Sequence, residues 1–340
     1  MATVIIAEAG VNHNGDLSLA LELVDAAADA GAHVVKFQTF SSQDLTTSLA
    51  EKASYQLLQD GQGTQRDMLQ TLELSQEEHK VISQHCKKRG ISFLSTAFGI
   101  PELNFLLELG IGAIKVPSGE ITHLPLLECM AQSAFQHNLP VYISTGMSTL
   151  AEIEAAMNVF LSCGVSRSNI TIMHCLSAYP APFDEVNLNV LKTLSDTFQS
   201  PVGYSDHTLG ISASVVAVAL GAKLIEKHIT LNRHLKGPDH SASLEPAEFK
   251  QMVESIHRTE LLLGTHIKQP QQSELNTRSV ARRSIRASQF IPAGTIFQHH
   301  HFICQRPADG LSPMQIPDLL GRPAMRSFNR GDLISHMLDD

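Results

Sequence analysis

Two histidines in this chain stand at the ends of consecutive predicted strands. His207 follows the apolar run 201–204, and His228 lies in the run 223–229, with a helical pattern over 211–220 between them. In a right-handed β-α-β unit the carboxyl ends of two such strands are neighbours, so the two imidazoles are expected to lie together. Either histidine alone is as readily structural as functional. The shared position of the pair, with carboxylates nearby, predicts a divalent metal site.

Further polar side chains occur where the other predicted strands end. Ammonium groups, short hydroxyls and glycines that let the backbone approach closely are what a phosphate group requires. The residues predicted to hold such an anion are Lys36, Lys115, Ser118, Ser144 and Ser205. The carboxyl groups available for proton transfer are those of Glu8, Glu120, Glu226 and Asp239. The other polar residues at strand ends are Gln38, Ser95, Thr96, Thr145, His174, Tyr179 and Asp206.

The elements that would position these residues alternate between strands and helices. Predicted strands cover 4–7, 34–38, 91–95, 113–116, 141–144, 170–174, 201–204 and 223–229. Predicted helices follow them at 17–30, 75–89, 101–109, 124–137, 150–163, 187–198, 211–220 and 246–263. About eight strand–helix pairs are typical of a (β/α)₈ barrel, in which polar residues at the carboxyl ends of the strands form the active site. A doubly wound open sheet is the alternative, but it more often carries a Gly-rich phosphate loop after its first strand.

Two segments interrupt or end this alternation. Residues 41–71 are polar and long for a connection between a strand and a helix, which predicts a partly helical loop over the site. From residue 269 the composition changes, and short β-like pieces follow a polar stretch. We therefore predict a barrel over residues 1–268, a linker over 269–280 and a small β-rich domain over 281–340. A domain of roughly 60 residues is marginal on its own, so it should dock on a barrel.

The composition excludes several classes of protein. A net charge of −9 without a basic stripe argues against nucleic-acid binding. Five cysteines, an odd number with no Cys-x-x-Cys pair, are typical of a reducing cytoplasm. No signal peptide is recognised, and no apolar run reaches the ~20 residues that a membrane span requires. The expected protein is a cytoplasmic enzyme that acts on small molecules and binds neither nucleic acid nor membrane.

Short motifs are spread along the whole barrel segment, at 6–15, 35–40, 115–120, 144–147, 203–208, 226–228 and 237–240. Together they resemble the sialic acid synthase family, which includes N-acetylneuraminate, legionaminate and pseudaminate synthases. Segments 281–285 and 305–310 resemble the antifreeze-like (SAF) domain that ends these enzymes. The resemblance covers the whole chain. It implies a (β/α)₈ TIM barrel followed by a small C-terminal β-rich SAF domain.

The resemblance also implies a reaction, the condensation of phosphoenolpyruvate with an open-chain N-acetylated hexose such as N-acetylmannosamine. The products would be a nine-carbon α-keto acid sugar and phosphate. A metal would polarise the sugar aldehyde, the phosphoenolpyruvate methylene would attack it, and water would add to the resulting cation. Phosphate would then leave by C–O cleavage. The implied metal is Mn²⁺, with Mg²⁺ and Co²⁺ as alternatives.

Matched position by position, the motifs assign roles to single residues. His207 and His228 correspond to the metal ligands, and Glu8 corresponds to the acidic residue beside them. The phosphoenolpyruvate contacts would be Lys36, Lys115, Ser118, Ser144 and Ser205. The contacts to the sugar or the intermediate would be Gln38, Glu120, Tyr179 and Asp239. Arg306 corresponds to an arginine that the SAF domain inserts into the barrel of a partner subunit, which implies a domain-swapped homodimer.

The chain departs from the family pattern at three places. Ala97 stands where a proline is usual, Ser177 stands where Asn or Thr often reaches the intermediate, and residues 299–301 are three histidines in place of an acidic segment. We interpret the histidines as a solvated loop and include Ser177 among the substrate-binding residues.

Three alternatives remain open at this point. A legionaminate synthase would use 2,4-diacetamido-2,4,6-trideoxymannose, and segments 53–56 and 237–243 look nearer to the neuraminate and legionaminate branches than to the pseudaminate branch. A Schiff-base aldolase would use Lys36 or Lys115 as its nucleophile. A non-catalytic ice- or sugar-binding protein is suggested only by the SAF-like tail and leaves the polar strand ends unexplained.

Overall fold

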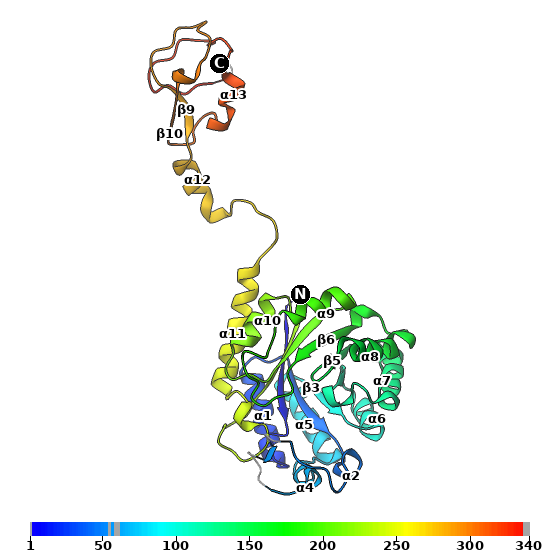
Figure 1. Ribbon diagram of the computed structural model, residues 1–340. Helices are drawn as coiled ribbons and strands as arrows, with labels where there is room; N and C mark the ends of the chain where they lie inside the picture. The colour runs from blue at the N-terminus through cyan, green and yellow to red at the C-terminus, as the bar shows by residue number, and fades with distance from the viewer. Residues whose placement is uncertain (1, 54–55, 58–61, 336–340) are drawn as a thin grey trace. The chain divides into compact units, whose positions relative to one another are not determined.

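The computed structural model describes residues 2–53, 56–57 and 62–335. The chain divides into two compact units, Met1–Gly264 and Thr265–Asp340 (Figure 1). Within the described residues no helix is both long and apolar enough to cross a membrane.

Eight parallel strands form the centre of the first unit. They are β1 (Val4–Gly10), β2 (Val34–Thr39), β3 (Ser92–Ala97), β4 (Ile114–Val116), β5 (Val141–Ser144), β6 (Ile170–Cys175), β7 (Val202–Asp206) and β8 (Leu224–His228). The first strand pairs with both β2 and β8, and the order of the sheet runs β3-β2-β1-β8-β7-β6-β5-β4. Contacts between β3 and β4 bring the two ends of the sheet together. The nearly closed barrel confirms the predicted fold and excludes the doubly wound open sheet.

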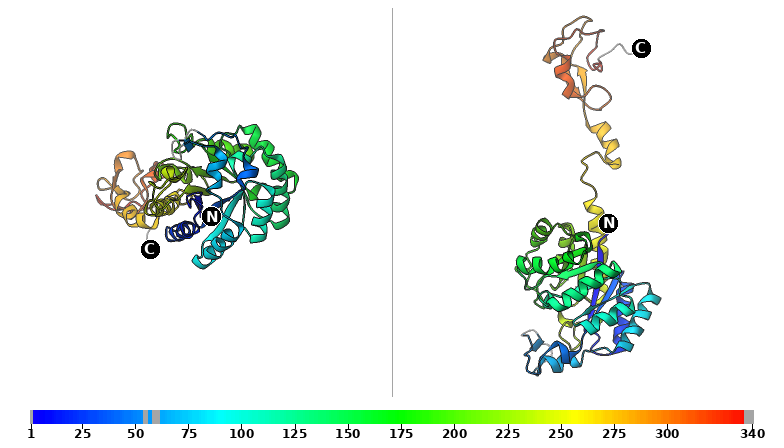
Figure 2. Two further views of the ribbon diagram at one scale, coloured as in Figure 1. Left: turned by 90° about the horizontal axis from the view of Figure 1, so that it is seen from below. Right: turned by 90° about the vertical axis from the view of Figure 1, so that its right-hand side faces the viewer.

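Helices lie outside the strands in all the views (Figure 1, Figure 2). They are α1 (Leu17–Asp29), α5 (Gln76–Arg89), α6 (Ile100–Leu109), α7 (Leu124–His137), α8 (Leu150–Ser162), α9 (Val190–Phe198), α10 (Ser212–Ala219) and α11 (Pro246–Leu263). Local sequence explains where they begin and end. The Asp16 side chain caps α1, Ser75 and Glu78 form a capping box at α5, and Gly90 ends α5 in the left-handed conformation.

The inside of the barrel is built in layers. A small apolar cluster fills the layer nearer the amino-terminal ends of the strands. It consists of Ile6, Leu94, Ala113, Met173 and Leu224. Side chains on a strand alternate between faces, so the residue two positions further along each strand also points inward. Those next residues are Glu8, Thr96, Lys115, Cys175 and Glu226. The barrel therefore carries a polar layer directly above an apolar one, at the carboxyl ends of its strands.

The long connection after β2 contains two short helices, α2 (Ser42–Leu45) and α4 (Gln65–Gln70). This agrees with the predicted partly helical loop. Its apolar side chains pack with those of the strand ends in a separate cluster, made of Val11, Phe40, Met68 and Leu72 with Leu45, Leu69 and Phe98 against it. Residues 54 and 55, part of the segment used above to compare family branches, lie outside the described residues.

The second unit has a core of its own. Strands β9 (Ser284–Ala287) and β10 (Phe302–Gln305) pair antiparallel, and a short helix α13 (Ile316–Leu319) follows. Their apolar side chains form a cluster of Ile285, Ala287, Ile291, Phe297, Leu319, Ala324, Phe328 and Ile334. One of the short β-like pieces predicted after residue 269, at 291–295, is not a strand. Pro292 and Gly294 make a turn there, and Ile291 forms only an isolated bridge.

The stretch predicted as a plain polar linker contains helical structure. The turn Gln272–Glu274 leads into α12 (Leu275–Ala281). The helix start is stabilised by Gln271 and Glu274, whose side chains bond to each other's backbone N–H groups. This capping box begins with glutamine, which is not one of the preferred first residues, so the sequence pattern did not reveal it.

Candidate active site

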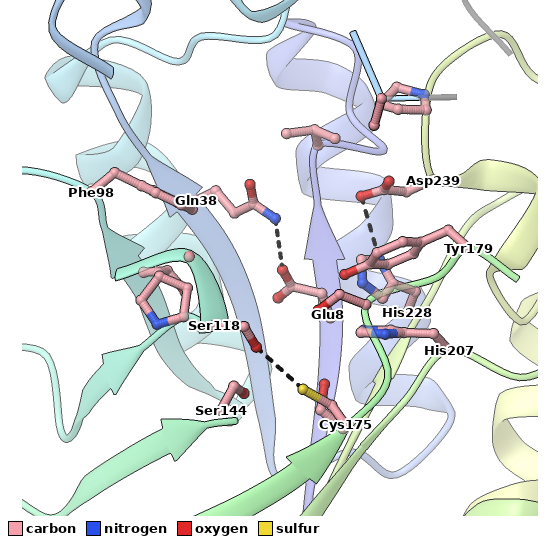
Figure 3. Close-up of a pocket in the computed structure, with 18 of the residues that line it drawn as sticks. Glu8, Gln38, Phe98, Ser118, Ser144, Cys175, Tyr179, His207, His228 and Asp239 are labelled. Carbon is pink, nitrogen blue, oxygen red and sulfur yellow. Dashed lines mark hydrogen bonds and ion pairs between the residues drawn. The ribbon is translucent and has the colours of Figure 1, made fainter. Parts of the chain in front are cut away.

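A cavity of ≈ 460 Å³ opens at the carboxyl ends of the barrel strands. Most of the residues singled out above line it, and they come from the eight strands and the loops after them (Figure 3). They are Glu8, Lys36, Gln38, Thr96, Lys115, Ser118, Ser144, Ser177, Tyr179, Ser205, His207, Glu226, His228 and Asp239. The fold thus gathers the predicted anion-binding, acidic and imidazole groups in one place.

Charged groups at the floor of the cavity neutralise one another. The Lys36 ammonium lies 2.8 Å from Glu8 Oε2 and 3.7 Å from Glu226 Oε2. Burial lowers the pKa of Lys36, but the carboxylates of Glu226 and Glu8 outweigh burial, so the net effect raises it. Burial raises the pKa of Glu8, whereas the pKa of Glu226 is lowered because Lys115 and Lys36 outweigh its burial. Gln38 completes the group by donating to Glu8 Oε1 at 3.1 Å.

A second set of donors surrounds Lys115. Its ammonium donates to Ser144 Oγ at 2.6 Å and lies 3.9 Å from Glu226 Oε1, and burial lowers its pKa. Ser118 Oγ accepts from the Gly146 N–H at 3.0 Å and lies 3.2 Å from Cys175 Sγ, so a bound anion would compete with the thiol for the Ser118 hydroxyl proton. A Cβ atom on Gly146 would overlap the Ser177 hydroxyl, so only glycine allows this approach. An ammonium, two hydroxyls and a closely approaching backbone are the groups that bind phosphate in proteins.

The two histidines face each other across the neighbouring strands β7 and β8. Their ring centroids are 5.5 Å apart, and the Tyr179 ring lies 4.1 Å from the His207 ring. His207 Nδ1 bonds to the Leu176 carbonyl oxygen at 2.7 Å, so this nitrogen carries the proton and Nε2 keeps its lone pair. Burial lowers the pKa of both imidazoles. Asp239 Oδ2 lies 3.7 Å from His228 Nδ1, and burial raises the pKa of Asp239 to about 7.

These groups fit a weakly held divalent metal. Both imidazoles are held neutral, which is the form that binds metals, and His228 Nδ1 is buried without a hydrogen-bond partner among the described residues. The part of the chain that the structure describes contains no ready-made group of three or more His, Cys, Asp or Glu ligands. A metal at the histidine pair would therefore complete its coordination with water or substrate oxygens.

One wall of the cavity is apolar. Its side chains are those of Val11, Met68, Leu69, Leu72 and Phe98, which follow β1, surround α4 and follow β3. The polar residues Gln56 and Gln65 of the same long connection also line the cavity. The opposite side carries Tyr179, Asp239 and the histidines. The cavity can therefore hold a ligand with one polar and one apolar side.

Some predicted residues lie elsewhere. Glu120 is not among the residues that line the cavity, and its carboxylate lies 2.8 Å from His123 Nδ1. Arg306 is exposed and belongs to the second unit. The strand ends His174 and Asp206 also point away from the cavity, because they are one residue out of phase with the inward-facing side chains.

One lining residue was missed for the same reason. Cys175 Sγ lies 3.2 Å from Ser118 Oγ inside the cavity (Figure 3). The predicted strand ended at His174, whereas the strand continues to Cys175. Counting alternate positions from Met173 would have pointed to Cys175 instead of His174.

The comparison with known families decides where this chain belongs. Residues 23–268 match the NeuB family, and residues 282–336 match the SAF domain. The chain belongs to the NeuB family. Among its relatives is the N,N'-diacetyllegionaminic acid synthase of Campylobacter jejuni, 46% identical over 98% of this chain and 98% of that protein. The enzyme of the same name from Legionella pneumophila is 44% identical over 97% of this chain and 93% of that protein.

Solved structures of the NeuB type agree with this assignment. The N-acetylneuraminic acid synthetase of Leptospira borgpetersenii, in complex with citrate, superposes with a TM-score of 0.71 at 36% identity. The match covers 82% of this chain and 90% of that one. These relatives are named as synthases, and this chain covers 98% and 93% of the two legionaminic acid synthases. The protein is therefore an enzyme, which excludes a purely ice- or sugar-binding role.

Proposed function

We propose that this NeuB protein is a nonulosonic acid synthase that condenses phosphoenolpyruvate with an N-acetylated hexose. The observation that carries the proposal is the floor of the cavity. Two buried lysines and short hydroxyls lie there beside two neutral imidazoles, in a chain whose relatives are named as synthases of such acids. The products would be a nine-carbon α-keto acid sugar and inorganic phosphate.

The phosphoenolpyruvate would lie over Lys36, Lys115, Ser118, Ser144 and Ser205. Lys115, Ser118 and Ser144 supply donors for its phosphate. Ser205 already donates to Glu226 Oε1 at 3.0 Å, so a bound anion would compete for its hydroxyl proton. Glu8 and Glu226 balance the charges of the two lysines before any ligand arrives. A substrate with phosphate and carboxylate charges therefore requires a further cation at this floor.

His207 and His228 would hold that cation, which we propose to be Mn²⁺, with Mg²⁺ and Co²⁺ as alternatives. When bound there, the metal would polarise the sugar aldehyde and lower the pKa of a water molecule. Removal of metal with a chelator should abolish turnover, and added Mn²⁺ should restore it. Full turnover by exhaustively metal-free protein would refute the assignment.

The remaining polar residues of the cavity would act on the sugar and the intermediate. Attack of the phosphoenolpyruvate methylene on the aldehyde carbon leaves positive charge on the carbon that bears the phosphate ester. The fixed carboxylates of Glu8 and Glu226 at the floor of the cavity would stabilise that charge. Asp239, with its pKa raised to about 7, suits proton exchange near neutral pH. Gln38, Tyr179 and Ser177 would bind sugar oxygens, and Glu120 is proposed as a further sugar contact only on the resemblance.

The apolar wall favours a 6-deoxy sugar over N-acetylmannosamine. Val11, Met68, Leu69, Leu72 and Phe98 offer no hydrogen bond from their side chains to a hydroxyl group. A 6-deoxy sugar has a methyl group where N-acetylmannosamine has a hydroxymethyl group. We therefore place 2,4-diacetamido-2,4,6-trideoxymannose, the substrate of a legionaminate synthase, before N-acetylmannosamine. The identity to the Campylobacter and Legionella enzymes supports the same choice.

The direct test is release of phosphate from phosphoenolpyruvate in the presence of Mn²⁺ and each of the two sugars. We expect turnover that depends on the sugar, with kcat/KM higher for the trideoxy sugar by about 10- to 100-fold. Equal or reversed preference would contradict the choice of sugar. Absence of sugar-dependent phosphate release with both sugars would contradict the proposed function.

We propose in addition that the enzyme is a domain-swapped homodimer in the cytoplasm. The lysines that line the cavity are engaged with carboxylates, and Arg306 of the second unit is exposed and available for an N-acetyl carbonyl oxygen. All five cysteines are unpaired, which supports a reducing compartment.

The swap can be tested with two inactive proteins, Lys115→Ala and Arg306→Ala, mixed so that their subunits exchange. One site of the mixed dimer then joins the intact barrel of one chain to the intact SAF domain of the other, so activity should reappear. Exchange without recovery would mean that each SAF domain serves its own barrel.

A Schiff-base aldolase remains the second candidate, because burial lowers the pKa of Lys115. Lys36 no longer supports it, since its carboxylate partners raise its pKa. Borohydride added with the substrates would trap a covalent adduct on Lys115 in an aldolase and none in the proposed mechanism.

A further inference from the structure

The motif Asn12–Gly15 has no part in the reaction proposed above, although it lies directly at the end of β1. It forms a tight turn, in which the Asn14 N–H bonds to the Val11 carbonyl oxygen at 3.0 Å and Asn14 has a positive φ of 52°. Opposite this turn runs the loop of residues 230–243, which follows β8 and carries Asp239. The side chains of both asparagines cross to that loop.

The first connection, here called the inner link, starts from Asn12. Its side-chain amide donates to the Ile229 carbonyl oxygen at 2.8 Å and to Ser243 Oγ at 2.9 Å. The Ser243 hydroxyl in turn donates to the backbone carbonyl oxygen of Asp239 at 2.7 Å. Asn12 and Ser243 are only 2% and 1% exposed, so water does not compete for these bonds.

The second connection, the outer link, starts from Asn14. Its amide nitrogen donates to the Lys236 carbonyl oxygen at 2.9 Å, and its amide oxygen lies 3.3 Å from His240 Nε2. His240 is fixed from its other side by a 2.7 Å bond between Nδ1 and Thr230 Oγ1.

Gly237 makes the outer link possible. It has a φ of +146°, and a Cβ atom there would lie 2.8 Å from Asn14 Oδ1 and 2.8 Å from His240 Cδ2. Any larger residue at this position would therefore both strain the backbone and push the two linked side chains apart.

The two links hold the backbone on both sides of Asp239. The outer link fixes Lys236 and His240, and the inner link fixes the Asp239 carbonyl itself. The Asp239 side chain is thereby directed into the cavity, 3.7 Å from His228 Nδ1 (Figure 3). Without this restraint the loop would add the entropy of several free residues to every binding event.

Backbone bonds already join the base of the loop to the sheet. Ile229 N–H bonds to the Glu8 carbonyl oxygen, Thr230 N–H to that of Leu244, and Leu244 N–H to that of His228. The asparagine links are additional. The inner link starts at the base of the loop, on Ile229 and Ser243, and both links end on residues 236–240 at its tip. Their loss should therefore free the tip while the barrel stays folded.

We propose that Asn12 and Asn14, acting through Ser243 and His240, are positioning residues that hold Asp239 over the cavity for sugar binding. The proposal rests on the proposed function only in naming the sugar as the ligand of Asp239. That the links order the loop is independent of the substrate.

The test compares two serine variants of the same loop in the full-length protein with Mn²⁺. Ser243→Ala removes the inner link. Ser241→Ala is the matched control, because Ser241 Oγ is buried and has no hydrogen-bond partner within the described residues. We expect Ser243→Ala to raise the KM of the sugar about tenfold, as for loss of one buried hydrogen bond, while the KM of phosphoenolpyruvate changes less than about twofold. Ser241→Ala should change neither value. The partly exposed Asn14→Ala tests the outer link in the same way and with less risk to folding.

A second measurement separates positioning from a general loss of structure. In an Asp239→Ala background, Ser243→Ala should have almost no further effect on the KM of the sugar, because the residue that it positions is gone. An undiminished effect in that background, or equal effects on both substrates, would overturn the proposal.

Hydrogen–deuterium exchange of residues 236–241 gives a readout that needs no substrate. Exchange should accelerate at least about tenfold in Ser243→Ala and stay unchanged in Ser241→Ala. Unchanged exchange in Ser243→Ala would refute the links whatever the reaction. If the wild-type protein instead turns over neither sugar but the exchange result holds, the proposed function has failed and the positioning of the loop has not.

Discussion

Strands β7 and β8 carry buried charged residues on both faces, and the two faces differ in how completely those charges are satisfied. On the outer face, Lys227 lies 3.0 Å from Asp206 Oδ2 and donates to the Thr208 carbonyl oxygen at 2.5 Å. Asp206 also accepts from the Thr208 N–H and from the hydroxyls of Thr208 and Ser214. Both side chains of this ion pair are completely buried.

On the inner face, the buried polar groups have fewer hydrogen-bond partners. Glu226 Oε2 and His228 Nδ1 have no hydrogen-bond partner in the described part of the chain, and each lies 3.7 Å from its nearest charged group. These atoms face a cavity, whereas the outer pair faces α10 through Ser214. A fully bonded buried pair serves the fold, and an incompletely bonded group that faces a cavity is prepared for a ligand.

The largest expected effect of a single substitution is on catalysis, at Lys115 of the inner face. Lys115→Met should lower kcat/KM by about 10³-fold, because it removes a fixed cation from the phosphate site. The midpoint of urea unfolding should move little, since Lys115 donates to the Ser144 hydroxyl and Lys36 stays beside Glu226 when Lys115 is replaced. Steady-state kinetics and urea titration of the same preparation measure both. A large loss of stability would show that Lys115 stabilises the fold, as Lys227 is expected to do.

On the outer face, a substitution should affect the stability of the fold. Lys227→Met leaves Asp206 buried without its counter-ion and should lower the free energy of unfolding by about 3–5 kcal/mol. The exposed Lys223, one strand position before β8, supplies the control, and Lys223→Met should change stability by less than about 0.5 kcal/mol. Chemical denaturation of the three proteins checks this. If Lys227→Met were as stable as the control, the outer pair would not be structural.

His13 tests whether an unpaired buried atom alone marks a functional group. Its Nε2 atom has no partner among the described residues, yet His13 does not line the cavity. Burial lowers the pKa of His13 to about 4 from 6.5. The unfolded chain therefore takes up a proton first as the pH falls below 6.5, and the folded protein should lose about 3 kcal/mol of stability between pH 6.5 and pH 4.

The variant His13→Gln should remove that part of the pH dependence while leaving kcat nearly unchanged. Unfolding free energies of both proteins, measured from pH 7 to pH 4, give the difference between the two slopes. Identical slopes would show that His13 titrates normally, and a large loss of kcat would mean that the unpaired atom serves the reaction after all.

The barrel could be predicted because its periodic strands and helices, with starts at Asp16 and Ser75, encode the elements locally. The gathering of Lys36, Lys115, His207 and His228 followed from one rule, that strand ends meet on one face.

The errors at His174 and Cys175 came from a strand end misplaced by one residue, which exchanges the two faces. The apolar wall could not be predicted, because Met68 and Phe98 meet only through tertiary packing. The asparagine links could not be predicted for the same reason, since Asn12 and Ser243 are 231 positions apart.

We propose that the inner face carries out a condensation in which phosphoenolpyruvate loses phosphate by C–O cleavage. The most direct measurement uses phosphoenolpyruvate labelled with ¹⁸O at the oxygen that bridges carbon and phosphorus, with Mn²⁺ and 2,4-diacetamido-2,4,6-trideoxymannose. Mass spectrometry of the two products then locates the label. We expect all of the label in inorganic phosphate and none in the keto acid. Label retained in the keto acid would mean that the P–O bond breaks, and it would contradict the account.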